Sequence, residues 1–314
     1  MKRILFVTKG DNCDYQNDCL FHGLCSLPDV EVYILNENNY DFMFKGLWTE
    51  EKLRSLYGKG FSITDLIPPE KKRVHSPETA RRYIREKFYD LVIYGSVFRC
   101  TELLDDVLQN YPRSKIVFVD GEDEDFHFRL TRGARYRFFQ ERKARKYARL
   151  GIYFKRELLP KFRGLFLPIS FAIPGELIVP EIPEKTRNLA FIIPGKVETY
   201  IYDTPESYYR GYQEAVFGMT FKKAGWDCLR HYEILANGCI PYFPGIEDLP
   251  QDTMFQFPVN LIRYGNTLYE TNNSRQTAEL AQTLLDYCRK YLTTKFIAEY
   301  LLAQVESVNP CSAD

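Results

Sequence analysis

The spacing of apolar runs at the start of the chain constrains the fold more than any other feature. Residues 2–8 contain a short apolar run, and residues 30–35 form a second run that alternates apolar and polar side chains. Between them Leu20, Leu24 and Leu27 recur at helical spacing, and Pro28 ends the pattern. A strand, a helix and a strand within residues 2–35 form a βαβ unit, so the sequence predicts a parallel sheet.

Two further runs extend this predicted sheet. Residues 90–96 and 115–122 each contain an apolar stretch that ends in small or acidic residues. A helix is expected over residues 78–88, with Ser76 as its N-cap and Pro77 as its first residue. Open parallel sheets bind ligands beyond the carboxyl ends of their strands. The first half of the chain therefore predicts a Rossmann-like domain with polar residues at its binding edge.

A stretch rich in proline divides the chain. Residues 167–174 contain Pro168 and Pro174, and Pro180 and Pro183 follow, which is typical of a domain boundary. After it we expect strands over residues 189–193 and 239–243, and helices over residues 205–216, 225–237, 280–285 and 293–305. The expected fold class is α/β, with two Rossmann-like domains that face each other across a cleft. These domains are residues 1–168 and 169–314, and the last helix is expected to pack back on the first domain.

The composition favours a large folded protein without a membrane anchor. The 314 residues are 45% hydrophobic and the formal net charge is zero, which excludes global disorder. No apolar run approaches the roughly 18 residues of a membrane span, and the first residues lack the pattern of a signal peptide. We therefore expect a cytoplasmic protein, or one of the host cytoplasm if the chain is viral, with its eight cysteines as free thiols.

The neutral total hides one strongly basic segment. Residues 129–156 contain eleven basic residues and one acid, Glu141, so the segment carries +10 and the rest of the chain −10. Cations interleaved with aromatic residues are typical of a surface that follows a phosphate backbone. On this interpretation the segment binds a polyanionic acceptor such as DNA through Arg142, Lys143, Arg145 and Lys146. The alternative is a solvated helix face paired with the acidic run at residues 122–125.

A second charged pattern lies in the helix expected over residues 225–237. Four of its residues share one helix stripe, because they are spaced by four, three and four: Trp226, Arg230, Glu233 and Asn237. A cation and a carboxylate near a helix N-terminus suit a nucleoside diphosphate, because phosphates attract positive charge and ribose hydroxyls donate to a carboxylate. The alternative is an exposed pair of Arg230 and Glu233, worth only about 0.3 kcal/mol.

The same segment resembles a known family. Arg-x-x-Glu at residues 230–233, followed by Gly-Cys-Ile-Pro at residues 238–241, is similar to the donor-binding region of GT-B glycosyltransferases, especially exostosin-like and family-1-like members. The resemblance implies that Glu233 holds the donor ribose, and that Arg230 with one or both of Lys222 and Lys223 holds the diphosphate. His231 is open between a donor ligand and a core contact. The Glu-x7-Glu motif of many retaining members is absent, since Pro241 stands eight residues after Glu233.

An inverting transfer requires a base for the acceptor hydroxyl. Position at a strand end that faces the cleft makes Asp120, Glu122 and Asp14 the candidates, and each is alternatively a turn or cap residue. The four histidines lack metal-ligand spacing, so we predict no metal site. Glycine-rich nucleotide motifs are also absent, and no cofactor is expected. A helix N-terminus and cations are expected to neutralise the leaving diphosphate instead.

The resemblance thus implies a hexosyl- or pentosyltransferase that moves a sugar from a nucleotide-sugar donor to an acceptor hydroxyl. If the basic segment binds a polyanionic acceptor, the resemblance implies a hydroxymethylated DNA base as its sharpest form, because glycosyltransferases that modify phage DNA share this general fold. A glycan or a small molecule is the alternative. The alternative from another class is a non-catalytic module that binds nucleic acid through residues 129–156.

Overall fold

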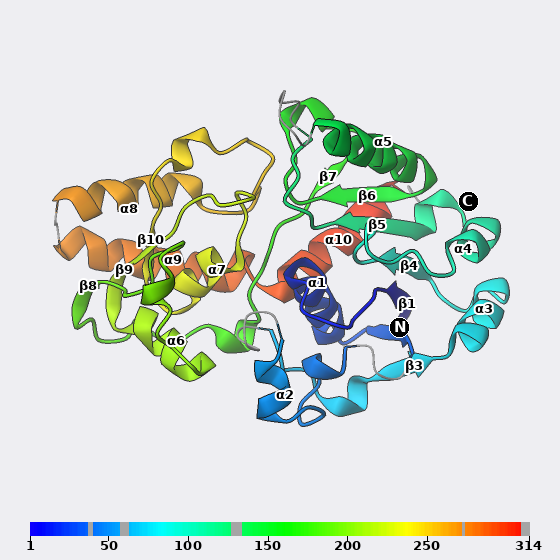
Figure 1. Cartoon of the computed structure of the whole chain (residues 1–314), viewed down its shortest axis with the longest axis horizontal. Helices are drawn as coiled ribbons and strands as arrows, with labels where there is room; N and C mark the ends of the chain where they lie inside the picture. Colours follow the sequence, from blue (N-terminus) through cyan, green and yellow to red (C-terminus); the bar gives the residue numbers. More distant parts are fainter. Residues whose placement is uncertain (37–39, 57–62, 127–133, 272–273, 309–314) are drawn as a thin grey trace.

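Two separate parallel sheets organise the protein, described by a computed structural model over residues 1–36, 40–56, 63–126, 134–271 and 274–308 (Figure 1). The larger sheet has seven strands in the order β3-β2-β1-β4-β5-β6-β7, and the smaller has three in the order β10-β9-β8. The larger sheet consists of β1 (Lys2–Val7), β2 (Val30–Leu35), β3 (Arg73–His75), β4 (Leu91–Tyr94), β5 (Ile116–Asp120), β6 (Ile152–Lys155) and β7 (Leu167–Pro168). The smaller sheet consists of β8 (Arg187–Leu189), β9 (Ala215–Met219) and β10 (Ile240–Tyr242).

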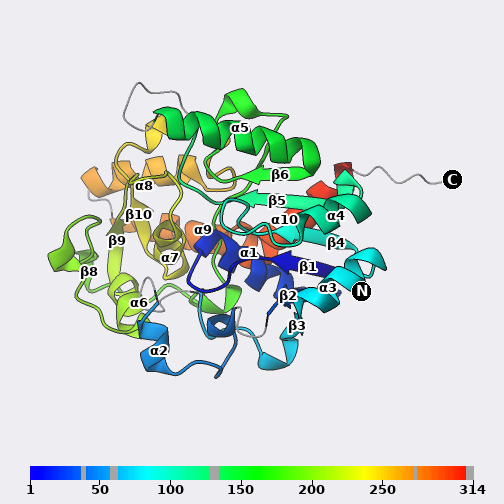
Figure 2. The same cartoon turned by 45° about the vertical axis from the view of Figure 1, so that its right-hand side comes forward.

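Helices cover both sheets, and the last helix crosses from one half to the other. The larger sheet carries α1 (Tyr15–Ser26), α2 (Glu50–Arg54), α3 (Pro77–Arg85), α4 (Leu104–Asn110) and α5 (Ala134–Leu150). The second half contains α6 (Pro205–Gln213), α7 (Leu229–Ala236), α8 (Val259–Thr271) and α9 (Ser274–Tyr291), followed by α10 (Thr294–Val308). Figures 1 and 2 both place α10 beside α1, in the half opposite to α9.

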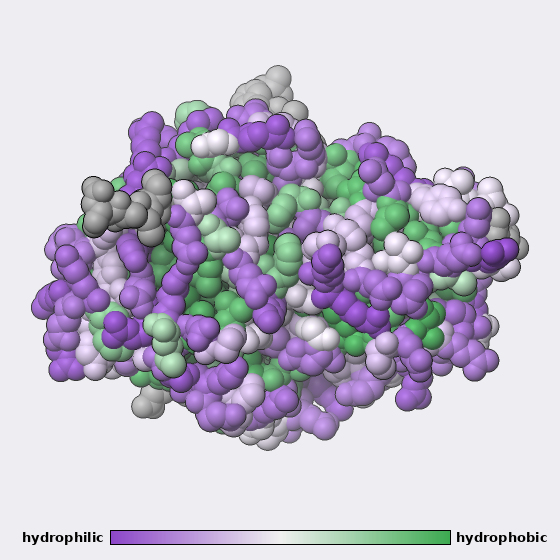
Figure 3. Space-filling model, turned by 180° about the vertical axis from the view of Figure 1, so that it is seen from behind, coloured by the Kyte–Doolittle hydropathy of each residue, from purple (hydrophilic) through white to green (hydrophobic). Residues whose placement is uncertain are grey.

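The core follows from the burial of the central strands on both faces. Alternate residues of β1 enter different apolar clusters: Ile4 and Phe6 pack with α1 and α10, whereas Leu5 and Val7 pack with α3, α4 and α5. Such two-sided burial is what a parallel sheet covered by helices requires. Seen from behind, the rim of the molecule is largely hydrophilic, and hydrophobic residues show mainly in recesses (Figure 3).

Close packing of α10 on α1 depends on one small residue. A Cβ atom at Gly23 would lie 1.9 Å from the carbonyl oxygen of Thr294, so only glycine permits this approach. The neighbouring His22 lies 2.8 Å from the Thr294 hydroxyl through its Nδ1 atom. The last helix is thereby held against the first.

The structure confirms the expected α/β class with two parallel sheets across a cleft, and it corrects several boundaries. The strand expected over residues 189–193 is β8, which ends at Leu189. The helix expected over residues 205–216 ends at Gln213, because Ala215 already pairs with Arg187 in β9. The helix expected over residues 225–237 begins only at Leu229. The sequence analysis did not predict α2, β3, α4, β6, β7, β9 or α8 as separate elements.

Three further expectations concern the domain boundary, the state of the cysteines and the absence of a membrane span. The domain boundary between residues 168 and 169 stays a prediction, with β7 ending at Pro168 and β8 beginning at Arg187. The seven cysteines within the described ranges are free thiols. Among the helices that the structure describes, none combines the length and apolarity needed to cross a membrane.

Candidate active site

The carboxyl ends of both sheets border one cleft of about 1410 Å³. From the first half it is lined by the loops after β1, β4 and β5, chiefly Thr8–Asp14 in the first loop, with Ser96, Arg99 and Glu122. From the second half it is lined by the loops after β8 and β9 and by the start of α7, including Ile192, Tyr200, Lys223, Arg230 and Glu233. In the order 3-2-1-4-5-6 the connection reverses between β1 and β4, and ligands of such sheets bind at that crevice.

The N-terminus of α7 opens onto this cleft. Cys228 is its N-cap residue, and its side chain makes no capping hydrogen bond. Cys228, Leu229 and Arg230 all line the cleft. The first N–H groups of a helix lack partners within the helix and carry the positive end of its dipole. This wall of the cleft therefore suits a negatively charged group.

Glu233 lies one turn further along α7 and is fixed by a tyrosine. Its side chain is buried at 4% exposure yet lines the cleft, and its Oε2 atom accepts a hydrogen bond of 2.5 Å from the Tyr208 hydroxyl. Burial and the nearby Glu233 carboxylate raise the pKa of Tyr208 well above its ordinary value, so this hydroxyl stays a donor. The alternative of an exposed pair with Arg230 is wrong, because Glu233 is buried.

Arg230 points its guanidinium to the same wall. Its Nη2 atom lies 3.4 Å from the Tyr200 hydroxyl, and the guanidinium carbon lies 5.6 Å from the centre of the Tyr200 ring. The Nε atom is buried and has no hydrogen-bond partner among the described residues. A buried N–H without a partner is costly, so an acceptor supplied by a ligand would satisfy it.

The two lysines predicted to hold the diphosphate of the sugar donor lie in different places. Lys223 is exposed and lines the cleft. Lys222 is not among the lining residues, and its ammonium lies 4.8 Å from the centre of the Trp226 ring. Trp226 precedes α7, so the expected stripe of four residues does not include it.

His231 is an interior residue, so of the two roles left open by the sequence the structure favours the core contact. It is fully buried, and its Nε2 lies 2.9 Å from the carbonyl oxygen of Trp226. Since that oxygen only accepts, Nε2 carries the proton, and Nδ1 accepts from the Thr220 hydroxyl at 2.8 Å. Burial lowers the pKa of His231 to about 4. The neutral ring thus serves packing.

Two of the three predicted bases face the cleft. Asp14 accepts hydrogen bonds from the Ser96 hydroxyl at 2.9 Å and lies 3.1 Å from Nη1 of Arg99. Glu122 accepts from Nε of the same arginine at 3.1 Å. Asp14, Glu122 and Arg99 all line the cleft. Sequence reasoning missed Arg99, although it stands three residues after Ser96, the end of the strand expected over residues 90–96.

Asp120 does not belong to this set, and its prediction as a base is wrong. It is the last residue of β5, is 1% exposed and is not among the residues that line the cleft. Its carboxylate lies 3.0 Å from Nζ of Lys155 and accepts from the Tyr153 hydroxyl at 2.8 Å. Both partners come from β6, which pairs with β5. The aspartate therefore stabilises the sheet.

A buried polar network joins the two halves at the cleft, and we call Arg156, Glu157 and Asp227 the junction network. Arg156 and Asp227 are among the residues that line the cleft. Arg156 is 2% exposed, and its Nη1 atom donates to the Asp227 carbonyl at 2.7 Å and to the Glu157 carboxylate at 3.0 Å. Its Nε and Nη2 atoms bind Gly121 and Asp123. Burial raises the pKa of Asp227 to about 7, against the opposing effect of Arg156.

The junction network also sets where α7 begins. Glu157 accepts hydrogen bonds of 3.0 Å from the backbone N–H groups of both Trp226 and Asp227. A Cβ atom at Gly225 would lie 2.6 Å from Oε1 of Glu157, so glycine permits this approach. Sequence reasoning counted Arg156 with a basic surface and gave no signal for its inward position.

The four predicted acceptor cations lie on α5, away from the cleft. Arg142, Lys143, Arg145 and Lys146 are exposed, and none is among the cleft-lining residues. The acidic run contributes one partner to the helix, since Glu124 binds Arg137 at 2.9 Å. Residues 129 and 132 of the basic segment fall outside the described residues. Contact of these cations with an acceptor stays a prediction.

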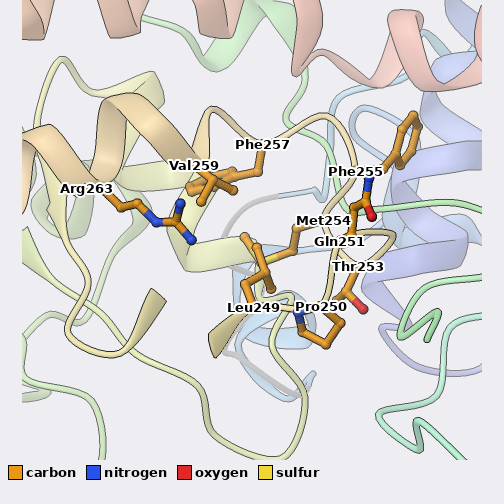
Figure 4. A pocket seen from close by; sticks show the side chains of 9 residues that line it. All are labelled: Leu249, Pro250, Gln251, Thr253, Met254, Phe255, Phe257, Val259 and Arg263. Atoms are coloured by element: carbon orange, nitrogen blue, oxygen red, sulfur yellow. The ribbon is translucent and has the colours of Figure 1, made fainter. Parts of the chain in front are cut away.

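A second, smaller hollow of about 300 Å³ lies in the other half of the protein. Figure 4 shows its lining, which comes from the segment 249–257 together with Val259 and Arg263 of α8. It contains no candidate site residue. Within the described ranges, no group of three or more His, Cys, Asp and Glu side chains is arranged to hold a metal ion, and independence from metal stays a prediction.

Similarity to known proteins is limited to solved structures of low sequence identity. No protein-family model matches it, and no curated protein is similar to it in sequence. It is similar to the Anabaena protein Alr3699/HepE in complex with UDP-glucose, with a TM-score of 0.49, 10% identity and coverage of 98% of this chain and 100% of that one. It is similar to an alpha-glucosyltransferase in complex with UDP and a 13-mer DNA containing a central A:G mismatch, with a TM-score of 0.48, 9% identity and coverage of 98% and 100%. MurG of Acinetobacter baumannii gives a TM-score of 0.42, 10% identity and coverage of 98% and 100%.

Proposed function

We propose that the protein is a GT-B-type glycosyltransferase that uses a nucleotide-sugar donor. The observation that carries this proposal is the arrangement of α7, whose uncapped N-terminus, Arg230 and Glu233 share one wall of the cleft. The helix N-terminus suits a diphosphate, and so does Nε of Arg230, which has no hydrogen-bond partner in the part of the chain that the structure describes. The Glu233 carboxylate, fixed by Tyr208, suits a ribose hydroxyl one turn away.

The opposite wall supplies the chemistry of transfer. The acceptor oxygen attacks the anomeric carbon, the bond from that carbon to the diphosphate breaks, and the hydroxyl proton passes to a carboxylate. Asp14 and Glu122 are the two candidate proton acceptors, and Arg99 holds both of them. The positive end of α7 and Arg230 would stabilise the charge that develops on the diphosphate, so this mechanism requires no metal.

The volume of the cleft bears on the transferred sugar, and its wall in the first half of the protein bears on the acceptor. A cleft of about 1410 Å³ accommodates a nucleotide with a hexosyl or pentosyl unit. The acceptor is a hydroxyl compound bound against the first half of the protein. DNA as that acceptor stays a prediction, since its four candidate cations lie outside the cleft.

Calorimetric titration with UDP, GDP and CMP tests the donor site. At least one nucleotide should bind saturably, and Glu233→Gln should weaken that binding by about 1.5–3 kcal/mol, the range for a hydrogen bond to a charged group. Glu247→Gln is the matched control, because Glu247 is exposed and does not line the cleft. Failure of all three nucleotides to bind would contradict the proposal and favour a non-catalytic protein.

Substitution of the two carboxylates tests the catalytic assignment. Asp14→Asn or Glu122→Gln, whichever removes the base, should lower kcat by about 10²–10⁴ and leave nucleotide affinity near the wild-type value. Asp120→Asn should instead lower the melting temperature, because Asp120 is buried against Lys155. Full activity in both cleft variants would exclude this mechanism.

A further inference from the structure

The outer face of α5 combines exposed phenylalanines with exposed cations. We define the α5 face as Phe138, Phe139, Arg142, Lys146 and Arg149, all of which are exposed. Ala144, Tyr147 and Ala148 are buried and hold the opposite side of the helix on the sheet. At 100° per residue the residues of the α5 face point away from this buried side.

The two phenylalanines are the unusual part of this face. Phe138 and Phe139 are each 58% exposed, and their ring centres lie 6.1 Å apart. Tyr136, in the same turn, is 61% exposed. Aromatic side chains gathered at one place on the surface mark a site of contact with another molecule.

The charge around these rings selects an anionic partner. The sequence of α5 contains seven basic residues and a single acid, Glu141. Arg145 is paired with that acid at 2.8 Å, and Arg137 is paired with Glu124. For Arg142, Lys146 and Arg149 no hydrogen bond or ion pair occurs within the part of the chain that the structure describes. These three cations are available to a negatively charged surface.

We propose that the α5 face docks the protein on an anionic lipid bilayer. The helix lies along the outside of the large sheet (Figures 1 and 2), and its face is not part of the cleft. A helix with apolar rings and flanking cations lies in the plane of a membrane interface, with the rings inserted and the cations at the phosphates. Single-stranded nucleic acid is instead bound in a groove that follows its backbone, which this outward helix side does not provide.

The first turn of α5 is connected to a loop that borders the cleft. The Arg137–Glu124 pair ties the first turn of α5 to the loop after β5, and Glu122 and Asp123 of that loop line the cleft. Phe138 and Phe139 immediately follow Arg137, so they lie at the end of α5 nearest this loop. The docking surface itself does not depend on the proposed glycosyl transfer.

Sedimentation of the full chain with vesicles tests the proposal. The vesicles are phosphatidylcholine alone, or phosphatidylcholine with about one third phosphatidylglycerol. The wild-type protein should bind the anionic vesicles at least about tenfold more tightly than the neutral ones, because each cation near the surface adds attraction. Combined Arg142→Gln, Lys146→Gln and Arg149→Gln should weaken this binding by about a hundredfold, and combined Phe138→Ser and Phe139→Ser by at least about tenfold.

Matched controls lie on helices other than α5. Tyr264→Ser replaces an aromatic residue that is 41% exposed, and combined Arg275→Gln and Lys295→Gln removes exposed cations of α9 and α10. Both controls should bind vesicles as the wild type does, and all variants should keep its melting temperature.

Three outcomes would overturn the docking proposal. They are absence of binding to anionic vesicles, binding that neither α5 variant weakens, and salt-sensitive binding of the α5 face to duplex or single-stranded DNA without vesicle binding. Nucleotide titration of the same variants separates the two proposals. Vesicle binding without nucleotide binding refutes the proposed function alone, and nucleotide binding without vesicle binding refutes the docking surface alone.

Discussion

The junction network and the cleft face of α7 contain the same kinds of side chain in opposite states. Each combines an arginine with a carboxylate, and the two lie only a few residues apart where Asp227 precedes Arg230. In the junction network every donor atom of Arg156 has a protein acceptor. On the α7 face Nε of Arg230 is buried without one among the described residues. Arginine N–H groups with protein acceptors thus hold the two halves together, whereas a buried arginine N–H without one indicates a place for a ligand.

The energetic consequences of the two arrangements also differ. A protein with a buried ion pair is often no more stable than a variant in which apolar residues replace both partners. Removal of one partner alone is strongly destabilising, because the other charge is left buried without compensation. A cation in an open cleft keeps contact with solvent, so its removal affects the ligand more than the fold. This contrast can be tested by substitution on both sides.

The largest expected effect is that of Arg156→Met on stability. The change leaves Glu157 and Asp227 buried without their cation, so the free energy of unfolding should fall by about 3–5 kcal/mol. Urea unfolding measures it. Arg230→Met is the control and should cost less than about 1 kcal/mol, and equal losses for both variants would remove the contrast.

The next effect is the loss of nucleotide affinity in Arg230→Met. A hydrogen bond to a charged group contributes about 1.5–3 kcal/mol, so the nucleotide dissociation constant should rise by about one to two orders of magnitude. Calorimetry measures it. Arg187→Met is the control, because Arg187 pairs with Glu214 outside the cleft. Unchanged affinity in Arg230→Met would show that its Nε does not serve a ligand.

A smaller effect is expected from a methyl group placed inside the junction. In Gly225→Ala the new Cβ would lie 2.6 Å from Oε1 of Glu157 and 2.9 Å from Oδ1 of Asp123. Such overpacking should cost about 1–3 kcal/mol, measured by thermal unfolding. Gly175→Ala is the control, since nothing lies within 4 Å of a Cβ atom there. An unchanged melting temperature in Gly225→Ala would mean that the junction network shifts to accept the methyl group without loss of stability.

The smallest effect is the change in stability with each pH unit that His231, the interior neighbour of Arg230, should cause. Its folded pKa of about 4 lies below the ordinary value of 6.5, so the unfolded chain binds the extra proton. Its contribution to stability is therefore complete above about pH 6.5 and decreases as the pH falls toward 4. The slope should be about 1 kcal/mol per pH unit in this window.

Replacement of the ring separates this effect from other titrations. His231→Gln should remove its share of the pH dependence of unfolding, measured by urea titration at several pH values. Asp227 opposes it, since a carboxyl with a raised pKa of about 7 loses its contribution as the pH rises from 3.8 toward 7. An unchanged slope in His231→Gln would place the ring among solvated groups and not in the interior.

Much of the fold could be predicted from local patterns. The strand at residues 30–35 matches β2, and Ser76 caps α3 as expected by accepting from the N–H of Thr79. Both features depend on residues that are neighbours in the sequence. The placement of Arg230 and Glu233 on the same side of one helix was likewise predicted from helical spacing, and both residues line the cleft.

Other parts of the site could not be predicted, because they depend on contacts between distant segments. Asp120 is the last residue of β5 and Glu122 stands two residues later, yet Lys155 of β6 binds the first and Arg99 binds the second. Only the order of strands in the sheet decides which carboxylate turns inward. The same holds for the cations of the basic segment, of which Arg156 lies inside and Arg142 outside.

By itself the sequence determined the parallel α/β architecture and the charged stripe of α7, since burial periodicity and helical spacing are written in consecutive residues. The tertiary structure alone decided where α7 begins, because Glu157 from the other half takes the N–H groups of Trp226 and Asp227. It also decided that His231 is interior while Arg230 faces the cleft. A hydrogen bond between residues 69 or 70 positions apart in the chain leaves no periodic trace, so its effect appears only when the chain is folded.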